Sequence, residues 1–514
     1  MDAPVNDTSK YVKLARSIFA SGGALLLNAL ITLILAPLIS KTVGTEAYGF
    51  VSLAKNITSY AMIITSALNS FAARHIVIAY HRNEKHKANV FFSSTVIGDF
   101  VLGTGLFLIA MIGVLFLDKL LHISQELTED VKILFLLVFL NFWLTTISTA
   151  FSAAGHILNK LDAVGLFKTI SYVCEVIVLL LCFLLLPPQV HYVGYGLVAT
   201  AIVIALGNVW LCHRYTPDLR PRARDFSWDA VRQLVTDGIW TSLNSLGDNL
   251  NHGLDLLVCN LMLTPISMGQ LAFSKTFYSV FGGMFILISS AFEPLYLKSY
   301  AKGDKETLLK EFKLAMKLSG MLSNIFFAGF VALGMAFYRL WIPQENIELI
   351  YTLTVINNLT TIPGGPMQPL YYIYVLTLKK KIPTLVTIGG GLLNVIGMYF
   401  LIQYTNLGIY AVVWTTAIIM AIINFGTNPL YMAHVLELPW HTFYPNILRN
   451  VISCGILVAV FKGVMSLYTP SSWFGLALAT CMLTLLGIGL HMLVVFQKND
   501  WKLIISKLNR RHAQ

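Results

Sequence analysis

The chain has 514 residues, of which 56% are hydrophobic and only 12% are charged, and its formal net charge is +11. Soluble domains usually carry about 25% charged residues, so this composition excludes an ordinary water-soluble fold. The long apolar runs predict an all-α integral membrane protein, because a helix satisfies its own backbone hydrogen bonds in lipid.

Fourteen apolar segments are long enough to cross a bilayer, which takes ~20 residues. The first follows Lys10, Lys13 and Arg16 and lacks a convincing cleavage site, so we expect it to be retained as a signal anchor. In chain order the predicted spans are residues 17–40, 47–73, 89–117, 131–153, 165–187, 193–213, 231–263, 267–297, 312–337, 347–376, 382–403, 407–430, 447–467 and 473–496.

The positive charges predict the orientation of these spans. Of the 36 Lys and Arg residues, 29 lie on the side that holds both termini, either in the segments outside the spans or within the first six residues of a span. The positive-inside rule makes that side cytoplasmic. The net charge is therefore a topology signal, and no nucleic acid partner is expected. The most basic connection, residues 214–230, is either a solvated orientation signal or a contact for anionic lipid headgroups.

A short motif occurs twice, 220 residues apart. Residues 49–55 (GFVSLAK) and residues 269–275 (GQLAFSK) each place a lysine six positions after a glycine. The same offset pairs Asn28 with Asp248. We therefore predict two six-helix lobes related by a parallel repeat, plus two C-terminal helices. The expected division is an N-lobe at 1–213, a basic linker at 214–230, a C-lobe at 231–430, and helices 13 and 14 with the tail at 431–514.

The predicted span 231–263 carries a stripe of polar side chains. Its members are spaced three or four residues apart, so they share one face of a helix. A charged group at the bilayer centre costs ~2.5–3.5 kcal/mol, so we expect this face to line an aqueous cavity between the lobes. The stripe consists of Asp237, Thr241, Asn244, Asp248, Asn251 and Asp255.

Two intramembrane lysines, Lys55 and Lys275, occupy equivalent positions in the repeat. We interpret them as the two sides of a cationic substrate site. Alternatively, each lysine could extend to the outer interface, or Lys275 could form a structural ion pair with Asp248. The polar wall of the site is expected to come from Asn28, Asn244, Asp248, Asn251 and Asp255.

Intramembrane carboxylates are candidates for coupling transport to Na⁺ or H⁺. Each could instead stay protonated and hydrogen-bonded. No nucleotide-binding loop, metal-ligand spacing or nucleophile constellation is evident, so we expect no cofactor, no metal site and no catalytic activity. The candidate coupling groups are Asp248, Asp255, Asp99 and Glu175.

The predicted span 347–376 contains the sequence Pro363-Gly364-Gly365-Pro366. Proline lacks a backbone donor and glycine loosens a helix, so the helix must be interrupted there. The interruption is either a hinge for alternating access or a fixed kink.

With these features in place, the chain resembles the polysaccharide flippases of the multidrug/oligosaccharidyl-lipid/polysaccharide (MOP) superfamily. The residues that carry the resemblance are Ser21-Gly22-Gly23, Gly44-Thr45-Glu46-Ala47-Tyr48-Gly49, the stretch from Gly269 to Lys275, Tyr278, and Glu293-Pro294. It implies a MATE-like, V-shaped pair of lobes in a bacterial inner membrane, and it places Tyr278 at the substrate site.

The resemblance also implies the transport of undecaprenyl-diphosphate-linked oligosaccharide from the cytoplasmic to the outer leaflet, by alternating access. Lysines would hold the diphosphate as compact point charges, Asn and Asp would bind sugar hydroxyls, and the lipid tail would stay among membrane lipids. Capsule or O-antigen assembly, with a polysaccharide polymerase as partner, would use the product.

Four other functions compete with this interpretation. A cation-coupled multidrug exporter of the same superfamily would favour an anionic cavity, which two lysines oppose. A membrane glycosyltransferase or polymerase typically has large soluble loops, whereas no loop here exceeds about 20 residues. A scaffold would leave the intramembrane charges unexplained. A peptidoglycan-precursor flippase would favour arginines, which the outer halves of the predicted spans lack.

Overall fold

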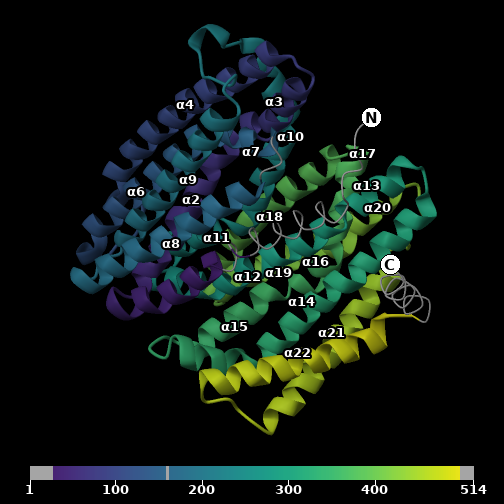
Figure 1. The fold of residues 1–514 in the computed structure, drawn as a ribbon. Coiled ribbons are helices and arrows are strands. Elements are labelled where there is room, and N and C mark those ends of the chain that lie inside the picture. The colour runs from purple at the N-terminus through teal and green to yellow at the C-terminus, as the bar shows by residue number, and fades with distance from the viewer. Residues whose placement is uncertain (1–22, 24–26, 158–160, 498–514) are drawn as a thin grey trace. The chain divides into compact units, whose positions relative to one another are not determined.

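A computed structural model describes residues 23, 27–157 and 161–497 of the protein, and every regular element in these ranges is a helix (Figure 1). Within them, ten helices are long and apolar enough to cross a membrane, and a shorter apolar helix covers Leu27–Thr42. The predicted all-α, multi-pass membrane fold is therefore confirmed.

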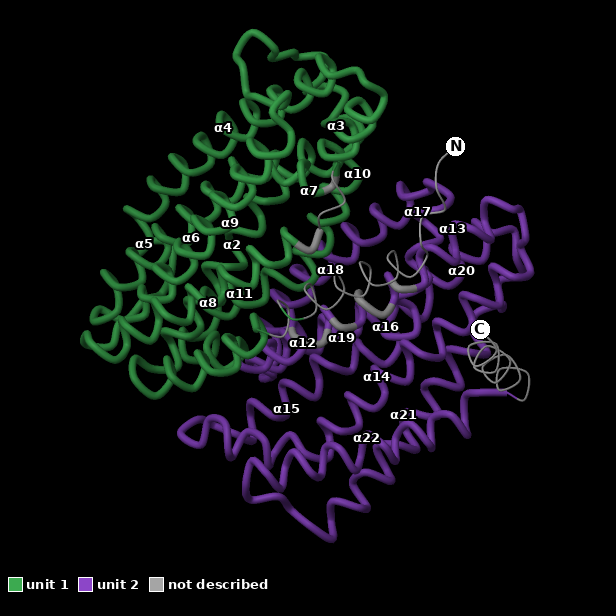
Figure 2. The backbone as a smooth tube through the Cα atoms, viewed as in Figure 1, with its two compact units in different colours: residues 1–272 green, residues 273–514 purple. Residues whose placement is uncertain are grey.

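The chain forms two compact units, residues 1–272 and 273–514 (Figure 2). After the helix Leu27–Thr42, unit 1 contains α2 (Thr45–Asn69), α3 (Ala72–His81), α4 (Lys85–Leu115), α5 (Leu117–Leu120), η1 (Gln125–Leu127), α6 (Thr128–Ser148), η2 (Thr149–Ser152), α7 (Ala153–Ile157), α8 (Leu161–Leu185), α9 (Tyr192–Tyr215), η3 (Ala223–Asp225), α10 (Trp228–His252), α11 (Asp255–Met262) and the start of α12 (Pro265–Ala291).

Unit 2 contains the rest of α12. Its further elements are α13 (Glu293–Ala301), α14 (Lys305–Trp341), α15 (Ile347–Asn358), α16 (Thr361–Met367), η4 (Gln368–Tyr371), α17 (Tyr372–Thr377), α18 (Lys381–Tyr404), α19 (Ile409–Ala421), the π-helical turn η5 (Ile422–Thr427), α20 (Asn428–Val435), α21 (Tyr444–Ser466) and α22 (Trp473–Val495).

Four of the fourteen predicted spans are not among the ten apolar helices. The span 17–40 begins outside the described residues, and 231–263 forms the polar pair α10 and α11. The span 267–297 forms α12 and α13, and 347–376 is divided into α15, α16, η4 and α17. The total of fourteen spans stays a prediction.

Helix α10 packs along α2, so residues 231–272 belong to unit 1 and not to the unit that follows. A Cβ on Gly238 would lie 2.0 Å from the carbonyl oxygen of Ala67, so only glycine permits this approach. The Ser242 hydroxyl donates to the carbonyl oxygen of Ile63 at 2.5 Å. Small residues and hydrogen bonds hold helices together in lipid, where apolar contact alone gives little. The predicted lobe boundary at 214–230 thus differs from the boundary between compact units, and the lobes stay a prediction.

The two copies of the repeated motif meet at their glycines. A Cβ on Gly49 would lie 2.9 Å from the Cα of Gly269, and a Cβ on Gly269 would lie 2.2 Å from the carbonyl oxygen of Thr45. Both glycines therefore allow the first turns of α2 and α12 to touch. The neighbouring Glu46 accepts a hydrogen bond from the backbone N–H of Ser124 at 2.9 Å, which fixes the start of α2.

The basic connection before α10 is attached to α4. The Asn89 side chain accepts from the backbone N–H of Arg220 at 2.8 Å and donates to Asp225 at 2.6 Å. The side chains of Arg220, Arg222 and Arg224 are nevertheless exposed. A contact between these arginines and anionic lipid headgroups stays a prediction.

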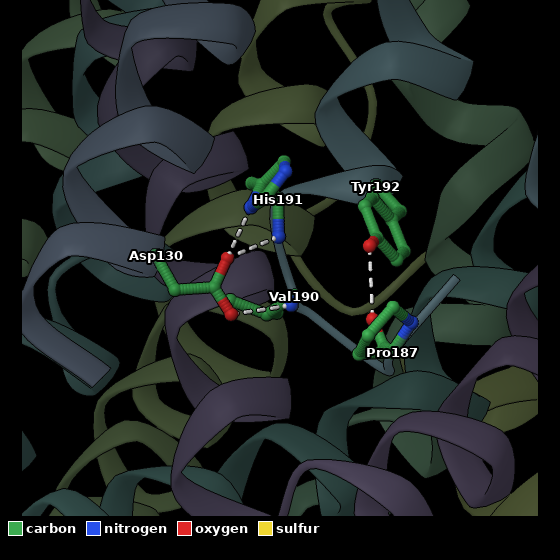
Figure 3. A network of polar contacts seen from close by, with 5 residues as sticks. All are labelled: Asp130, Pro187, Val190, His191 and Tyr192. Atoms are coloured by element: carbon green, nitrogen blue, oxygen red, sulfur yellow. Dashed lines mark hydrogen bonds and ion pairs between the residues drawn. The ribbon is translucent and has the colours of Figure 1, made fainter. Parts of the chain in front are cut away.

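A polar network joins the beginnings of α6 and α9 (Figure 3). The Asp130 carboxylate accepts from the backbone N–H groups of Val190 at 2.7 Å and His191 at 2.9 Å, and it contacts His191 Nδ1 at 2.5 Å. The Tyr192 hydroxyl donates to the carbonyl oxygen of Pro187 at 2.8 Å. One carboxylate thus satisfies backbone donors at the N-terminus of α9, which otherwise lack partners.

We expect Asp130→Asn to destabilise unit 1, because the amide has one acceptor oxygen where the carboxylate has two. Hydrogen bonds to charged groups contribute about 1.5–3 kcal/mol, so a loss of roughly that size is expected. The neighbouring Glu129→Gln is the matched control, since Glu129 is exposed. Thermal unfolding of the purified variants tests this, and equal midpoints for both would contradict it.

Candidate functional site

Lys55 lies on α2 in unit 1, and its side chain is exposed. It interacts electrostatically with Glu175 of α8 but forms no ion pair within the described part of the chain. The carboxylate of Glu175 is buried and accepts a hydrogen bond from the Thr200 hydroxyl of α9 at 3.2 Å. The ammonium of Lys55 thus remains available to an anion, while Glu175 is held by its neighbour.

Two predicted wall residues lie together on α10. The amide of Asn244 donates to the Asp248 carboxylate at 3.0 Å, and Asp248 is exposed. The next residue, Asn249, accepts from the hydroxyl of Ser59 at 2.6 Å. Ser59 lies one helical turn from Lys55, so Asp248 and Lys55 occupy similar levels on neighbouring helices.

The polar stripe does not continue along one exposed face, which corrects the sequence prediction. Helix α10 ends at His252, and the amide of Asn56 donates to the carbonyl oxygen of Gly253 at 3.3 Å. Asn251, in the last turn of α10, is nearly buried, and Asp255, the first residue of α11 after the break, is fully buried. A binding or coupling role for Asn251 or Asp255 stays a prediction.

The remaining predicted residues of unit 1 lie apart from this group. Asn28 is exposed near the start of the helix Leu27–Thr42, where its carbonyl oxygen accepts from Thr32 at 3.0 Å. Asp99 of α4 is fully buried and accepts from the Asn69 amide at 2.8 Å. Its second oxygen has no hydrogen-bond partner among the described residues. A coupling role for Asp99 or Glu175 stays a prediction.

In unit 2, α12 carries both Lys275 and Tyr278, which are half-buried and in contact with other residues of the protein. Tyr278 lines a cavity of about 390 Å³ together with Gly364 and Gly365 of the predicted hinge. The structure therefore brings three predicted site residues to one cavity within this unit.

The predicted span is interrupted, but residues 363–366 are themselves helical, which corrects the predicted position of the break. Helix α15 ends at Asn358, and the four residues lie within the short helix α16, which the 3-10 turn η4 follows. Pro363 lies in the first turn of α16, where a helix tolerates proline. Gly365 packs against α14, where a Cβ would lie 2.2 Å from Ser323 Oγ. The Ser319 hydroxyl donates to the carbonyl oxygen of Gly365 at 2.7 Å. These contacts hold α16 in place, and movement about Pro363 or Pro366 stays a prediction.

The sequence analysis missed the polar side chains that complete this cavity. The Tyr371 hydroxyl donates to Asn424 Oδ1 at 3.1 Å and accepts from the Asn428 amide at 3.1 Å. Asn424 and Asn428 are four residues apart in an apolar stretch, a spacing that could have indicated a shared polar face. Gln368 directly follows α16 and also lines the cavity.

The two units carry comparable buried pairs. Glu175 and Thr200 join α8 to α9, and the Asn394 amide donates to Thr416 at 3.1 Å between α18 and α19. The repeat offset of 220 places Glu175 within one residue of Asn394, whereas Thr200 and Thr416 are 216 residues apart.

These features lead to the comparison with known proteins. A family described as polysaccharide biosynthesis proteins matches residues 14–299, which is more than half of the chain. The chain belongs to this polysaccharide biosynthesis protein family. Another similar protein is "Uncharacterized membrane protein EpsK" of Bacillus subtilis (strain 168), at 26% identity over 95% of this chain and 96% of that protein.

Solved structures show the fold of this polysaccharide biosynthesis family member. The "Lipid II flippase MurJ, inward closed conformation" superposes with a TM-score of 0.64 at 16% identity, covering 93% of this chain and 99% of that one. An inward-facing "multidrug resistance MATE family transporter of the MOP superfamily" gives a TM-score of 0.63 at 14% identity, over 80% and 96% of the two chains. The predicted MATE/MOP-like fold is confirmed.

Proposed function

We propose that this protein is a flippase that moves undecaprenyl-diphosphate-linked oligosaccharide from the cytoplasmic to the outer leaflet for surface-polysaccharide assembly. It acts by alternating access in the bacterial cytoplasmic membrane, with both termini cytoplasmic. Its partners are the lipid-linked oligosaccharide, membrane lipids and a polysaccharide polymerase. It transports without catalysing a reaction. The family and the flippase-like fold support this proposal.

The observation that carries the proposal is the state of Lys55. An ammonium in a spanning segment costs ~2.5–3.5 kcal/mol unless water or an anion compensates it. Lys55 is exposed on α2, and Glu175, its electrostatic partner, is instead hydrogen-bonded to Thr200. A diphosphate compensates such a charge, and Lys275 at the repeat-related position of α12 supplies a second one.

The second candidate is a cation-coupled multidrug exporter, which the exposed carboxylate of Asp248 and the MATE-like fold favour. Depletion of the protein distinguishes the two. A flippase leaves lipid-linked oligosaccharide in the inner leaflet and removes surface polymer. A drug exporter leaves surface polymer normal and raises sensitivity to cationic dyes.

We propose Asp248 as the group that couples transport to Na⁺ or H⁺, because it is exposed and its hydrogen-bond donor is the neutral amide of Asn244. Asp248→Asn keeps the shape of the side chain and removes its charge. We expect transport by this variant to lose its dependence on pH or on sodium, measured in vesicles with imposed gradients. Asp229→Asn on the same helix is the control, because Asp229 is exposed and lies outside the polar stripe. An unchanged dependence in Asp248→Asn would remove Asp248 from this role.

A further inference from the structure

The cavity in unit 2 differs from the positions of Lys55 and Lys275 because it is lined by uncharged residues. It lies among α12, α16, η4 and the π-helical turn η5, and all of its lining residues are uncharged. Its polar groups are amides and hydroxyls, and its apolar groups include Phe285 and Met420. A cavity of this kind favours a neutral ligand with hydroxyl groups over a diphosphate or a cation.

Two amides offer hydrogen bonds to such a ligand. Asn424 is 2% exposed, and its Oδ1 atom accepts from Tyr371, so its Nδ2 hydrogens remain to be donated elsewhere. Gln368 lines the cavity and makes no side-chain hydrogen bond within the described ranges. Both amides line the cavity, so a ligand hydroxyl there could accept hydrogen bonds from them.

Gly364 keeps the cavity open. A Cβ at this position would meet only the Nδ2 atom of Asn424, at 3.9 Å, which is ordinary contact. The missing side chain therefore leaves space directly beside the Asn424 amide. Asn424 itself lies in a π-helical turn, a feature that is frequent at functional sites because it redirects side chains.

We propose that this cavity is a neutral-sugar subsite, in which Asn424 and Gln368 bind hydroxyl groups of one sugar of the transported oligosaccharide. The inference deepens the proposed function and rests on it for the identity of the substrate. It assigns sugar recognition to the uncharged cavity of unit 2, whose lining residue Tyr278 lies about one helical turn along α12 from Lys275.

Gly364→Val tests the subsite, because a Cβ there meets only Asn424 Nδ2 at 3.9 Å and the valine methyl groups would fill space beside that amide. Gly389→Val on α18 is the matched control, since Gly389 lies outside the cavity and a Cβ there meets nothing within 4 Å. The purified full-length protein is titrated separately with free glucose, galactose, N-acetylglucosamine and rhamnose, and saturation-transfer NMR reports binding. Gln368→Ala is measured in parallel.

We expect at least one of these sugars to bind the wild type and Gly389→Val equally. Gly364→Val should abolish the signal, and Gln368→Ala should weaken binding about five-fold, the equivalent of one neutral hydrogen bond. Absence of sugar binding to the wild type, or full binding by Gly364→Val, would overturn the subsite.

The depletion experiment distinguishes failure of the sugar subsite from failure of the proposed flippase function. If depletion leaves lipid-linked oligosaccharide in the inner leaflet but the purified protein binds no sugar, the flippase function is supported and the subsite is wrong. If sugar binding depends on Gly364 but depletion does not leave lipid-linked oligosaccharide in the inner leaflet, the subsite is supported and the flippase function is wrong.

Discussion

Surface-polymer export should be abolished by Lys55→Ala and by Lys275→Ala, while both variants remain in the membrane at near-normal abundance. Lys55 has no ion pair in the part of the chain that the structure describes, so its removal breaks no salt bridge. It would instead remove the charge that compensates the diphosphate. A hydrogen bond to a charged group contributes about 1.5–3 kcal/mol, which corresponds to roughly 10- to 150-fold in substrate affinity.

A third intramembrane lysine provides the control. Lys462 on α21 is exposed and lies outside both copies of the repeated motif. Lys462→Ala should export normally, and Lys55→Arg should retain part of the activity because it keeps the charge. Surface polymer is measured by antibody or lectin binding, and membrane abundance by immunoblot. Normal export by both alanine variants would show that Lys55 and Lys275 do not form a cationic substrate site.

The second large effect is expected from Gly269→Ala. The added methyl group would lie 2.2 Å from the carbonyl oxygen of Thr45, so the first turns of α2 and α12 would have to separate. Overpacking of this kind costs about 1–3 kcal/mol, and here the neighbour is rigid backbone. We expect a lower unfolding temperature in detergent and reduced abundance in the membrane.

Gly105→Ala on α4 is the matched substitution, because a Cβ at Gly105 meets nothing within 4 Å. It should be neutral or slightly stabilising, since alanine favours a helix over glycine. Gly49→Ala should behave like Gly269→Ala. A wild-type unfolding temperature for Gly269→Ala would show that the contact between the two motifs does not hold α2 and α12 together.

Much of the fold could be predicted from the sequence, because in lipid the hydrophobicity of a segment nearly determines its structure. The repeated motif was also visible in the sequence, since Lys55 and Lys275 are rare residues in an apolar context, while the repeat of whole lobes stays a prediction. The structure adds the reason for the glycines: Gly49 and Gly269 are the points at which the two copies touch.

The course of the chain at the end of α10 was harder to predict from the sequence. The spacing from Asp237 to Asp255 is helical throughout, so periodicity predicts one continuous face. The bond from Asn56 to the carbonyl oxygen of Gly253 instead accompanies the end of the helix, and it joins residues 197 positions apart. Tertiary contacts of that kind leave no trace in local spacing.

The cavity of unit 2 was missed for the same reason. Tyr278, Gly364, Gln368 and Asn424 come from separate elements, and only their packing brings them together. The sequence marked Gly364 as part of an interruption in a span. It did not indicate that this residue leaves space beside an amide.

The most direct test of the account uses the purified protein in vesicles that contain undecaprenyl-diphosphate-linked oligosaccharide. A glycan-specific lectin outside the vesicles reports how much oligosaccharide reaches the outer leaflet. We predict rapid transfer with the wild type and with Lys462→Ala. With Lys55→Ala or Lys275→Ala, transfer should be no faster than in protein-free vesicles. Wild-type vesicles that transfer no faster than protein-free ones would contradict this prediction.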